Sequence, residues 1–228
     1  MQTTKKAVEE VLTLPDDFAP TIKILGACGA MLAIICVALG MCSAVYADVS
    51  NDPMAMVKST VSQVVNVLQN KSTPATERRK QLISLVSDRF DFTDMARQTL
   101  GSHWTQLTPA QQQEFVPLFT SFMEDAYLDK IEGYSGQPID FIKQSSMGAG
   151  YAEVHTSVVQ PDKQPIQINY LLKQEGDSWR VYDVTVDDIS ITANYRNQFN
   201  RVINNQGYDA LVSAMRNKQR QLQDRLAS

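Results

Sequence analysis

The chain has 228 residues, of which 43% are hydrophobic and 20% are charged, and its formal net charge is −4. With only ten glycines and nine prolines, the chain is neither collagen-like nor of low complexity. The slightly acidic balance argues against nucleic acid as the main partner, because neutralising phosphate groups requires a basic face. The length suits one or two globular domains.

The first 47 residues differ from the rest. Residues 24–47 contain no charged side chain, and all three cysteines lie within this span, so the remaining chain has no disulfide or thiol chemistry. We expect residues 1–47 to be a signal peptide cleaved after Ala47, where small or compact residues precede the junction. The alternative is an uncleaved anchor, since about 20 apolar residues suffice to cross a bilayer. Either way, residues 48–228 are delivered outside the cytoplasm.

The first half of this domain has the periodicity of helices. One helix begins at Pro53, and its apolar stripe consists of Val57, Val61, Val64, Val65 and Leu68. A second helix follows a break near Pro74. A third, short helix ends at Gly101, a residue typical of helix ends.

A long fourth helix is predicted from Pro109. Thr108 and Gln111 flank this proline with the spacing of a capping box. Pro117 lies within the helix and is expected to kink it. The apolar face is broad and rich in aromatic side chains and methionine, and it carries Phe115, Leu118, Phe119, Phe122, Met123, Ala126, Tyr127 and Ile131.

From about Gln137 the hydrophobic period changes to two. Four strands are predicted, at residues 138–144, 151–160, 165–174 and 178–187. Short turns join them, as in an antiparallel meander. Ser190 then caps a further helix that ends at Gly207, and a last helix follows.

These elements predict an α+β fold in which helices pack on one face of a curved, about four-stranded antiparallel sheet. One face of the sheet is apolar and must be covered, which the long helices can do. A cone-like arrangement of this kind readily encloses an apolar cavity.

Motifs for catalysis are missing from the sequence. It contains no nucleophile elbow, no metalloprotease motif and no glycine-rich phosphate loop. Glu153 and His155 are two residues apart on a predicted strand, so they share a face and could perform acid–base chemistry. Solvated or structural roles are the simpler interpretation. We expect no catalytic residue and no cofactor.

Three acidic residues gather at the end of the last predicted strand: Asp183, Asp187 and Asp188. Carboxylates could bind a cation, but the spacing of an EF-hand is absent. Capping of the following helix is the simpler interpretation. We therefore expect no metal site.

A family resemblance spans residues 52–221. It rests on three stretches, which are FDFTDMAR at 90–97 with LGSHW at 100–104, LTPAQQQEF at 107–115, and WRVYDV at 179–184 with IS at 189–190 and NYRNQF at 194–199. In this order and spacing the chain resembles the MlaC, or toluene-tolerance, family of periplasmic phospholipid carriers of Gram-negative bacteria. One departure is Asp188, where the family commonly has glycine.

The resemblance implies a soluble periplasmic shuttle that holds a phospholipid by its acyl tails between the sheet and the helices. It also implies exchange of lipid with an outer-membrane lipoprotein–porin complex and with an inner-membrane ABC transporter and its anchored substrate-binding subunit. Such a system maintains the lipid asymmetry of the outer membrane. Nothing suggests an obligate interface, so we expect a monomer.

The binding of a phospholipid by its acyl chains has a physical basis. Two acyl chains of about 16 carbons gain on the order of 25 kcal/mol by leaving water, so a carrier must hide them. We expect the lipid to contact apolar and deformable side chains. The candidates are Phe115, Phe119, Phe122 and Met123 on the long helix, Val154, Ile168, Tyr170, Tyr182 and Val184 on the strands, and Tyr195 on the helix after them.

Other functions remain open at this stage. A hopanoid or another apolar lipid could be the cargo. An enzyme of the same architecture would use His155 and Glu153. A structural adaptor would be anchored through an uncleaved N-terminal span.

Overall fold

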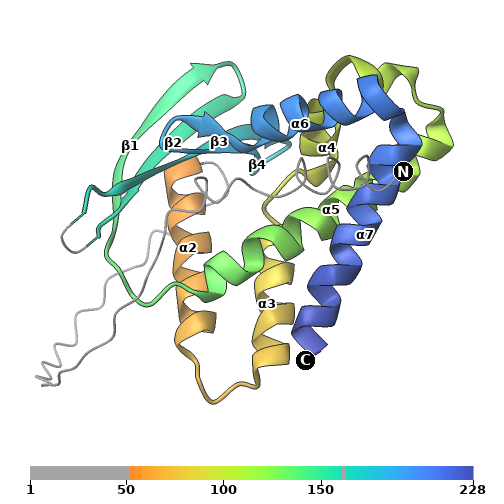
Figure 1. Cartoon of the computed structure of the whole chain (residues 1–228). Helices are drawn as coiled ribbons and strands as arrows, with labels where there is room; N and C mark the ends of the chain where they lie inside the picture. Colours follow the sequence, from red (N-terminus) through yellow and green to blue (C-terminus); the bar gives the residue numbers. More distant parts are fainter. Residues whose placement is uncertain (1–51, 161–162, 228) are drawn as a thin grey trace, which may run out of the picture.

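The computed structural model describes residues 52–160 and 163–227. The predicted signal peptide and its cleavage site lie outside the described residues. The described chain combines helices with one antiparallel sheet, which confirms the α+β prediction (Figure 1).

The helices begin and end close to the residues that the sequence indicates. They are α2 (Pro53–Gln69), α3 (Ala75–Ser87), α4 (Phe92–Leu100), the 3-10 helix η3 (Gly101–Gln106), α5 (Pro109–Glu132), α6 (Ile191–Gln206) and α7 (Tyr208–Ala227). The capping box of α5 is confirmed. The Gln111 N–H donates to Thr108 Oγ1 at 3.3 Å, and the Thr108 N–H donates to Gln111 Oε1 at 2.9 Å. The helix continues without interruption through Pro117.

The sheet is a meander in which each strand pairs with the next. Its strands are β1 (Ile139–Gly148), β2 (Tyr151–Val158), β3 (Ile166–Glu175), β4 (Ser178–Val186) and β5 (Ile189–Ser190). The four predicted strands are confirmed. The fifth has only two residues, too few for an alternating pattern to reveal it.

Two aspartates make the tight turn that produces β5. Asp187 and Asp188 have φ angles of 47° and 66°, in the left-handed region. The Asp187 carboxylate also accepts the Gln167 N–H at 2.9 Å, which ties the turn to β3. Asp188 is exposed and has no such contact in the described chain. Glycine adopts this left-handed backbone without steric cost, whereas an aspartate does so less readily.

Asp183 joins the sheet to the next helix. Its side chain is buried and accepts the N–H of Thr192 at 3.1 Å, the N–H of Val184 at 2.8 Å and the hydroxyl of Ser190. Ser190 in turn accepts the Ala193 N–H at the start of α6. The described residues hold no group of three side chains that could bind a metal ion. The hydrogen bonds of Asp183 to Ser190 and to the Thr192 N–H are those of a residue that caps the start of α6.

Helices cover the apolar face of the sheet from two directions. Helices α2 and α3 form a pair, and α2 packs against β1 and β2 (Figure 1). Helices α4, α5, α6 and α7 pack on one another, and α4 and α6 contact β4. The main hydrophobic core lies between this second group and the sheet.

The linker between α3 and α4 is fixed to the sheet. The Asp91 N–H donates to the Val181 carbonyl, and the Val181 N–H donates to the Arg89 carbonyl, both at 2.8 Å. Lys173 Nζ on β3 lies 2.5 Å from Asp91 Oδ2. Burial would raise the pKa of Asp91, but the hydrogen bond and charge of Lys173 outweigh burial and hold that pKa below its usual value.

We predict that Asp188→Gly stabilises the protein by up to about 1 kcal/mol, because glycine adopts the left-handed backbone without steric cost. Urea denaturation would measure the change. Asp187→Gly is the matched control, since it relieves similar strain but removes the acceptor for Gln167. Equal stabilisation by both substitutions would contradict this account of the turn.

We predict that Lys173→Met destabilises the protein by about 1 kcal/mol at pH 7, because it leaves the partly buried Asp91 carboxylate without its cation. The folded-state pKa of Asp91 lies below its ordinary value of 3.8. The carboxylate therefore contributes stability above that pH, and this contribution is lost as the pH falls through the folded-state pKa. Urea denaturation at pH 7 and pH 3 should show the larger effect of the substitution at pH 7. An equal or larger effect at pH 3 would be inconsistent with the ion pair.

Candidate functional site

A cavity of about 610 Å³ lies between the apolar face of the sheet and helices α2, α3 and α5. Its volume is in the range of small-molecule binding sites. The stripe predicted on α2 forms one wall, where Val57, Val61, Val64, Val65 and Leu68 line the cavity. Leu82, Ile83 and Val86 of α3 extend this wall.

Short side chains predominate on the α2 wall. Four of its lining residues are valines, which are short and stiff about χ1. Ile168 and Val184 of the sheet line the same cavity. Aromatic side chains also line it, including Phe90, Phe92 and Tyr170.

Four of the ten predicted lipid-binding residues line the cavity. Met123 projects from α5, while Ile168, Tyr170 and Val184 lie on β3 and β4. The strand residues share a face because Ile168 pairs with Val186 and Tyr170 pairs with Val184. Burial raises the pKa of Tyr170 to about 12.

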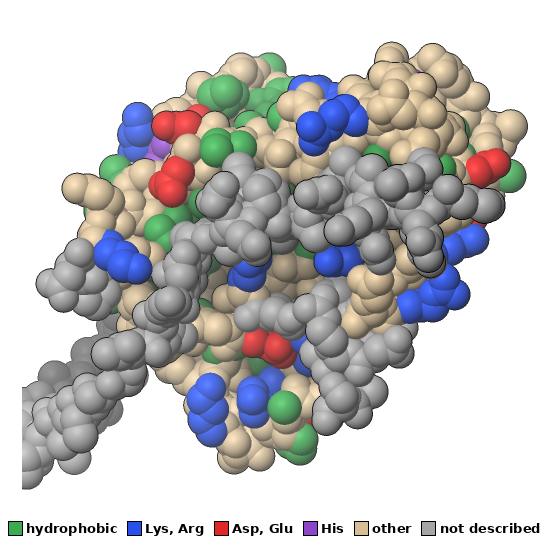
Figure 2. Space-filling model, in the orientation of Figure 1, with side chains coloured by type: hydrophobic (Ala, Val, Ile, Leu, Met, Phe, Trp, Pro, Cys, Tyr) green, Lys and Arg blue, Asp and Glu red, His purple; other side chains and the backbone are tan. Residues whose placement is uncertain are grey.

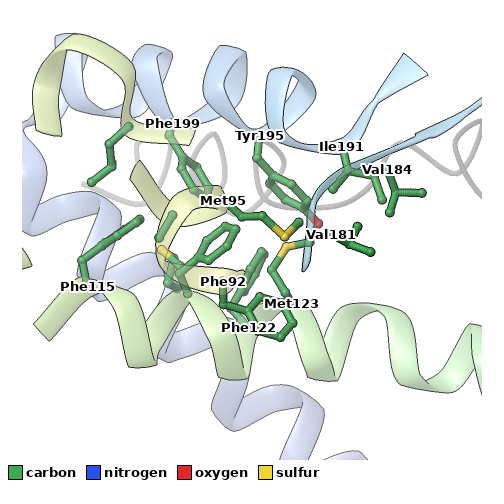
Figure 3. Packing of buried hydrophobic residues seen from close by; sticks show 14 of the residues in the cluster. Phe92, Met95, Phe115, Phe122, Met123, Val181, Val184, Ile191, Tyr195 and Phe199 are labelled. Carbon is green, nitrogen blue, oxygen red and sulfur yellow. The ribbon is translucent and has the colours of Figure 1, made fainter. Parts of the chain in front are cut away.

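Four predicted aromatic residues lie in the main core, not among the cavity-lining residues. Phe115, Phe119, Phe122 and Tyr195 are each at most 2% exposed. Figure 3 shows Phe115, Phe122 and Tyr195 among core side chains of α4, α5 and α6. The Phe122 and Tyr195 rings meet edge to face, 5.5 Å between centroids. Their size explains their place, since large rings fill the space between packed helices.

The other two predicted residues are also outside the cavity lining. Val154 faces inward but is fully buried in the core. Tyr182 lies at an irregularity of register, because Leu171 pairs with Asp183 whereas Leu172 pairs with Val181. This bulge breaks the alternation that placed Tyr182 with Val184. Its ring instead meets Tyr151 edge to face at 5.8 Å.

The cavity-lining residues of α2 and α3 were absent from the predicted site. The stripe of α2 was visible in the sequence, but its pattern is the same for a helix that fills a core. A preference for valine over larger side chains was the available signal. This signal predicts a cavity only when the strands that lie opposite the helix are known.

Three charged residues line the otherwise largely apolar cavity: Arg89, Glu124 and Lys130. Burial raises the pKa of Glu124, although the hydroxyl of Ser87, which donates to its carboxylate at 2.8 Å, acts in the opposite direction. Burial also raises the pKa of Tyr127 to about 12. The lining of the cavity is therefore suited to binding an apolar molecule, and its charged side chains are few.

The histidine–carboxylate pair lies on the other face of the sheet. His155 Nε2 is 3.4 Å from Glu153 Oε2, so the predicted proximity is confirmed. Thr156, the next residue, lines the cavity, and successive strand residues point to opposite faces. The pair and the cavity therefore cannot form one site.

The surface adds two observations. On the face shown in Figure 2, basic and acidic side chains are interspersed. Within residues 52–160 and 163–227, no helix is both long and apolar enough to cross a membrane.

Comparisons with known proteins were made by sequence and by structure. The MlaC protein family matches residues 58–217. The intermembrane phospholipid transport system binding protein MlaC of Haemophilus influenzae is 22% identical over 120 residues, and the match spans 51% of this chain and 56% of that protein. A phospholipid-binding protein from Ralstonia solanacearum, solved in complex with a phospholipid, has the same fold. Its TM-score is 0.66 at 24% identity, over 75% of this chain and 98% of that one. Since the family match extends over most of the sequence, this chain belongs to the MlaC family.

Proposed function

We propose that this protein is a phospholipid carrier that holds the acyl chains of one lipid in the cavity between the sheet and helices α2, α3 and α5. The observation that carries the proposal is the largely apolar lining of the 610 Å³ cavity. Membership of the MlaC family and the phospholipid bound to the Ralstonia solanacearum protein of the same fold support it.

The free energy of burying acyl chains suits a lipid carrier. Each buried CH₂ group contributes about 0.8 kcal/mol, so acyl chains strongly prefer the cavity to water. The same chains are equally well accommodated in a bilayer or in the apolar channel of a partner. Transfer between such sites is therefore close to neutral, and docking of partners or ATP hydrolysis elsewhere can give it direction.

The proposal includes the cellular setting that the family suggests. The protein is exported by a signal peptide cleaved after Ala47 and acts in the periplasm. It exchanges lipid with an outer-membrane lipoprotein–porin complex and with an inner-membrane ABC transporter through its anchored substrate-binding subunit. This exchange maintains the lipid asymmetry of the outer membrane.

Native mass spectrometry of residues 48–228, purified from a Gram-negative periplasm without detergent, tests the proposal. We expect one phospholipid per protein, identified after lipid extraction. A hopanoid or another apolar lipid in its place would change the cargo and keep the carrier. A lipid-free mass that persists after incubation with phospholipid vesicles would contradict the proposal.

We predict that Val65→Asp lowers phospholipid occupancy about tenfold or more, because it places a carboxylate against the acyl chains, where burying a charge is costly. Val65 lines the cavity and is partly buried. Occupancy would be measured by lipid extraction, and circular dichroism would confirm folding.

Val67→Asp is the matched control for that substitution. Val67 lies on the same helix and is also partly buried, but it packs against Leu68, Leu82 and Leu128 and is not among the cavity-lining residues. A folded Val65→Asp protein with the lipid content of the control would rule out this wall as a lipid contact.

A further inference from the structure

Arg89 is a partly buried cation on the wall of the cavity. It stands in the linker between α3 and α4. Within the described part of the chain, its guanidinium has no hydrogen-bond or ion-pair partner. A guanidinium carries five N–H donors, and the described protein supplies an acceptor for none of them. These donors are therefore free to bind a ligand that enters the cavity.

A second arginine contacts this linker, and its guanidinium already has hydrogen-bond partners. Arg180 on β4 donates to the carbonyl oxygens of Phe90 at 2.8 Å and Ser87 at 3.4 Å. It thus holds the linker backbone in place. Arg89 contributes to the same anchoring only through its backbone carbonyl, which accepts from Val181. Its side chain remains available for a ligand, on a support that is fixed to the sheet.

Nearby acidic side chains do not neutralise Arg89. Asp91 is paired with Lys173, and Glu124 accepts the hydroxyl of Ser87. Glu124 also lines the cavity, yet no ion pair joins it to Arg89. An anionic ligand at Arg89 would therefore meet a cation whose charge is not already compensated.

We infer that Arg89 binds the phosphate group of the lipid whose acyl chains fill the cavity. This inference rests on the proposed function, which supplies an amphiphile with an anionic group at the end of its apolar chains. The planar fork of a guanidinium matches two phosphate oxygens, and such charge-assisted pairs are among the stronger hydrogen bonds. Arg89 thus gives the cavity a preferred headgroup end and a preference for phospholipids over neutral lipids.

Lys130 provides a matched control. It also lines the cavity, but its side chain is exposed, so water already satisfies the ammonium group. Removing this charge changes the net charge of the protein by the same amount as removing Arg89. Only Arg89 should affect the choice of lipid.

The test uses lipid-free protein incubated with phosphatidylglycerol vesicles that contain diacylglycerol with the same acyl chains. The ratio of the two lipids bound is measured by extraction and mass spectrometry. We expect wild type to favour the phospholipid and Arg89→Gln to lose this preference by about tenfold or more, as for one charge-assisted hydrogen bond. Arg89→Lys should retain part of the preference, and Lys130→Gln all of it.

Several outcomes would overturn the inference. One is an unchanged preference in Arg89→Gln, and another is an equal loss in Lys130→Gln. If Arg89→Gln binds neither lipid, the folded Arg89→Lys protein provides the test. Wild-type selectivity in Arg89→Lys would exclude a contact that depends on the planar fork of the guanidinium. Binding of inorganic phosphate at Arg89, in wild-type protein that shows no preference for the phospholipid over diacylglycerol, would assign Arg89 to free phosphate. Wild type that takes up neither lipid would instead contradict the carrier function itself.

Discussion

The structure depends on how the apolar face of one antiparallel sheet is covered. Part of that face meets aromatic side chains of tightly packed helices, and there the space is filled. The remainder meets α2, whose stripe consists mainly of valines, and there a cavity remains. Filling an interior stabilises a protein through dispersion and burial, so an unfilled region is a cost that the rest of the core must offset. An acyl chain in the cavity would restore those contacts.

Local chemistry made much of the fold predictable. The capping box of Thr108 and Gln111, the helix end at Gly101 and the alternation along β3 each act within a few residues, and the structure has all three. The bulge at Tyr182 and the strand β5 depend instead on pairing between strands and on the turn at Asp187 and Asp188. Such features depend on the register between neighbouring strands, which the periodicity of a single strand does not predict.

The site was harder to predict than the fold because core and cavity use the same residue types. Phe115 and Met123 belong to one apolar helix face, yet only Met123 lines the cavity. The difference lies in what each side chain meets. Phe115 packs on Phe119 and Phe199, whereas Met123 lies further along α5, toward the sheet and α2. Aromatic content does not separate the two regions, because Phe92 and Tyr170 line the cavity while Phe119 lies in the filled core.

Carrier function places opposite demands on the two ends of a bound lipid. Acyl chains gain a similar free energy in any apolar surrounding, so they provide retention without specificity. A phosphate group is different, because its partners differ between water, a bilayer surface and a protein. A cation at the wall, as proposed for Arg89, would therefore select among lipids with identical tails, which the apolar walls cannot do.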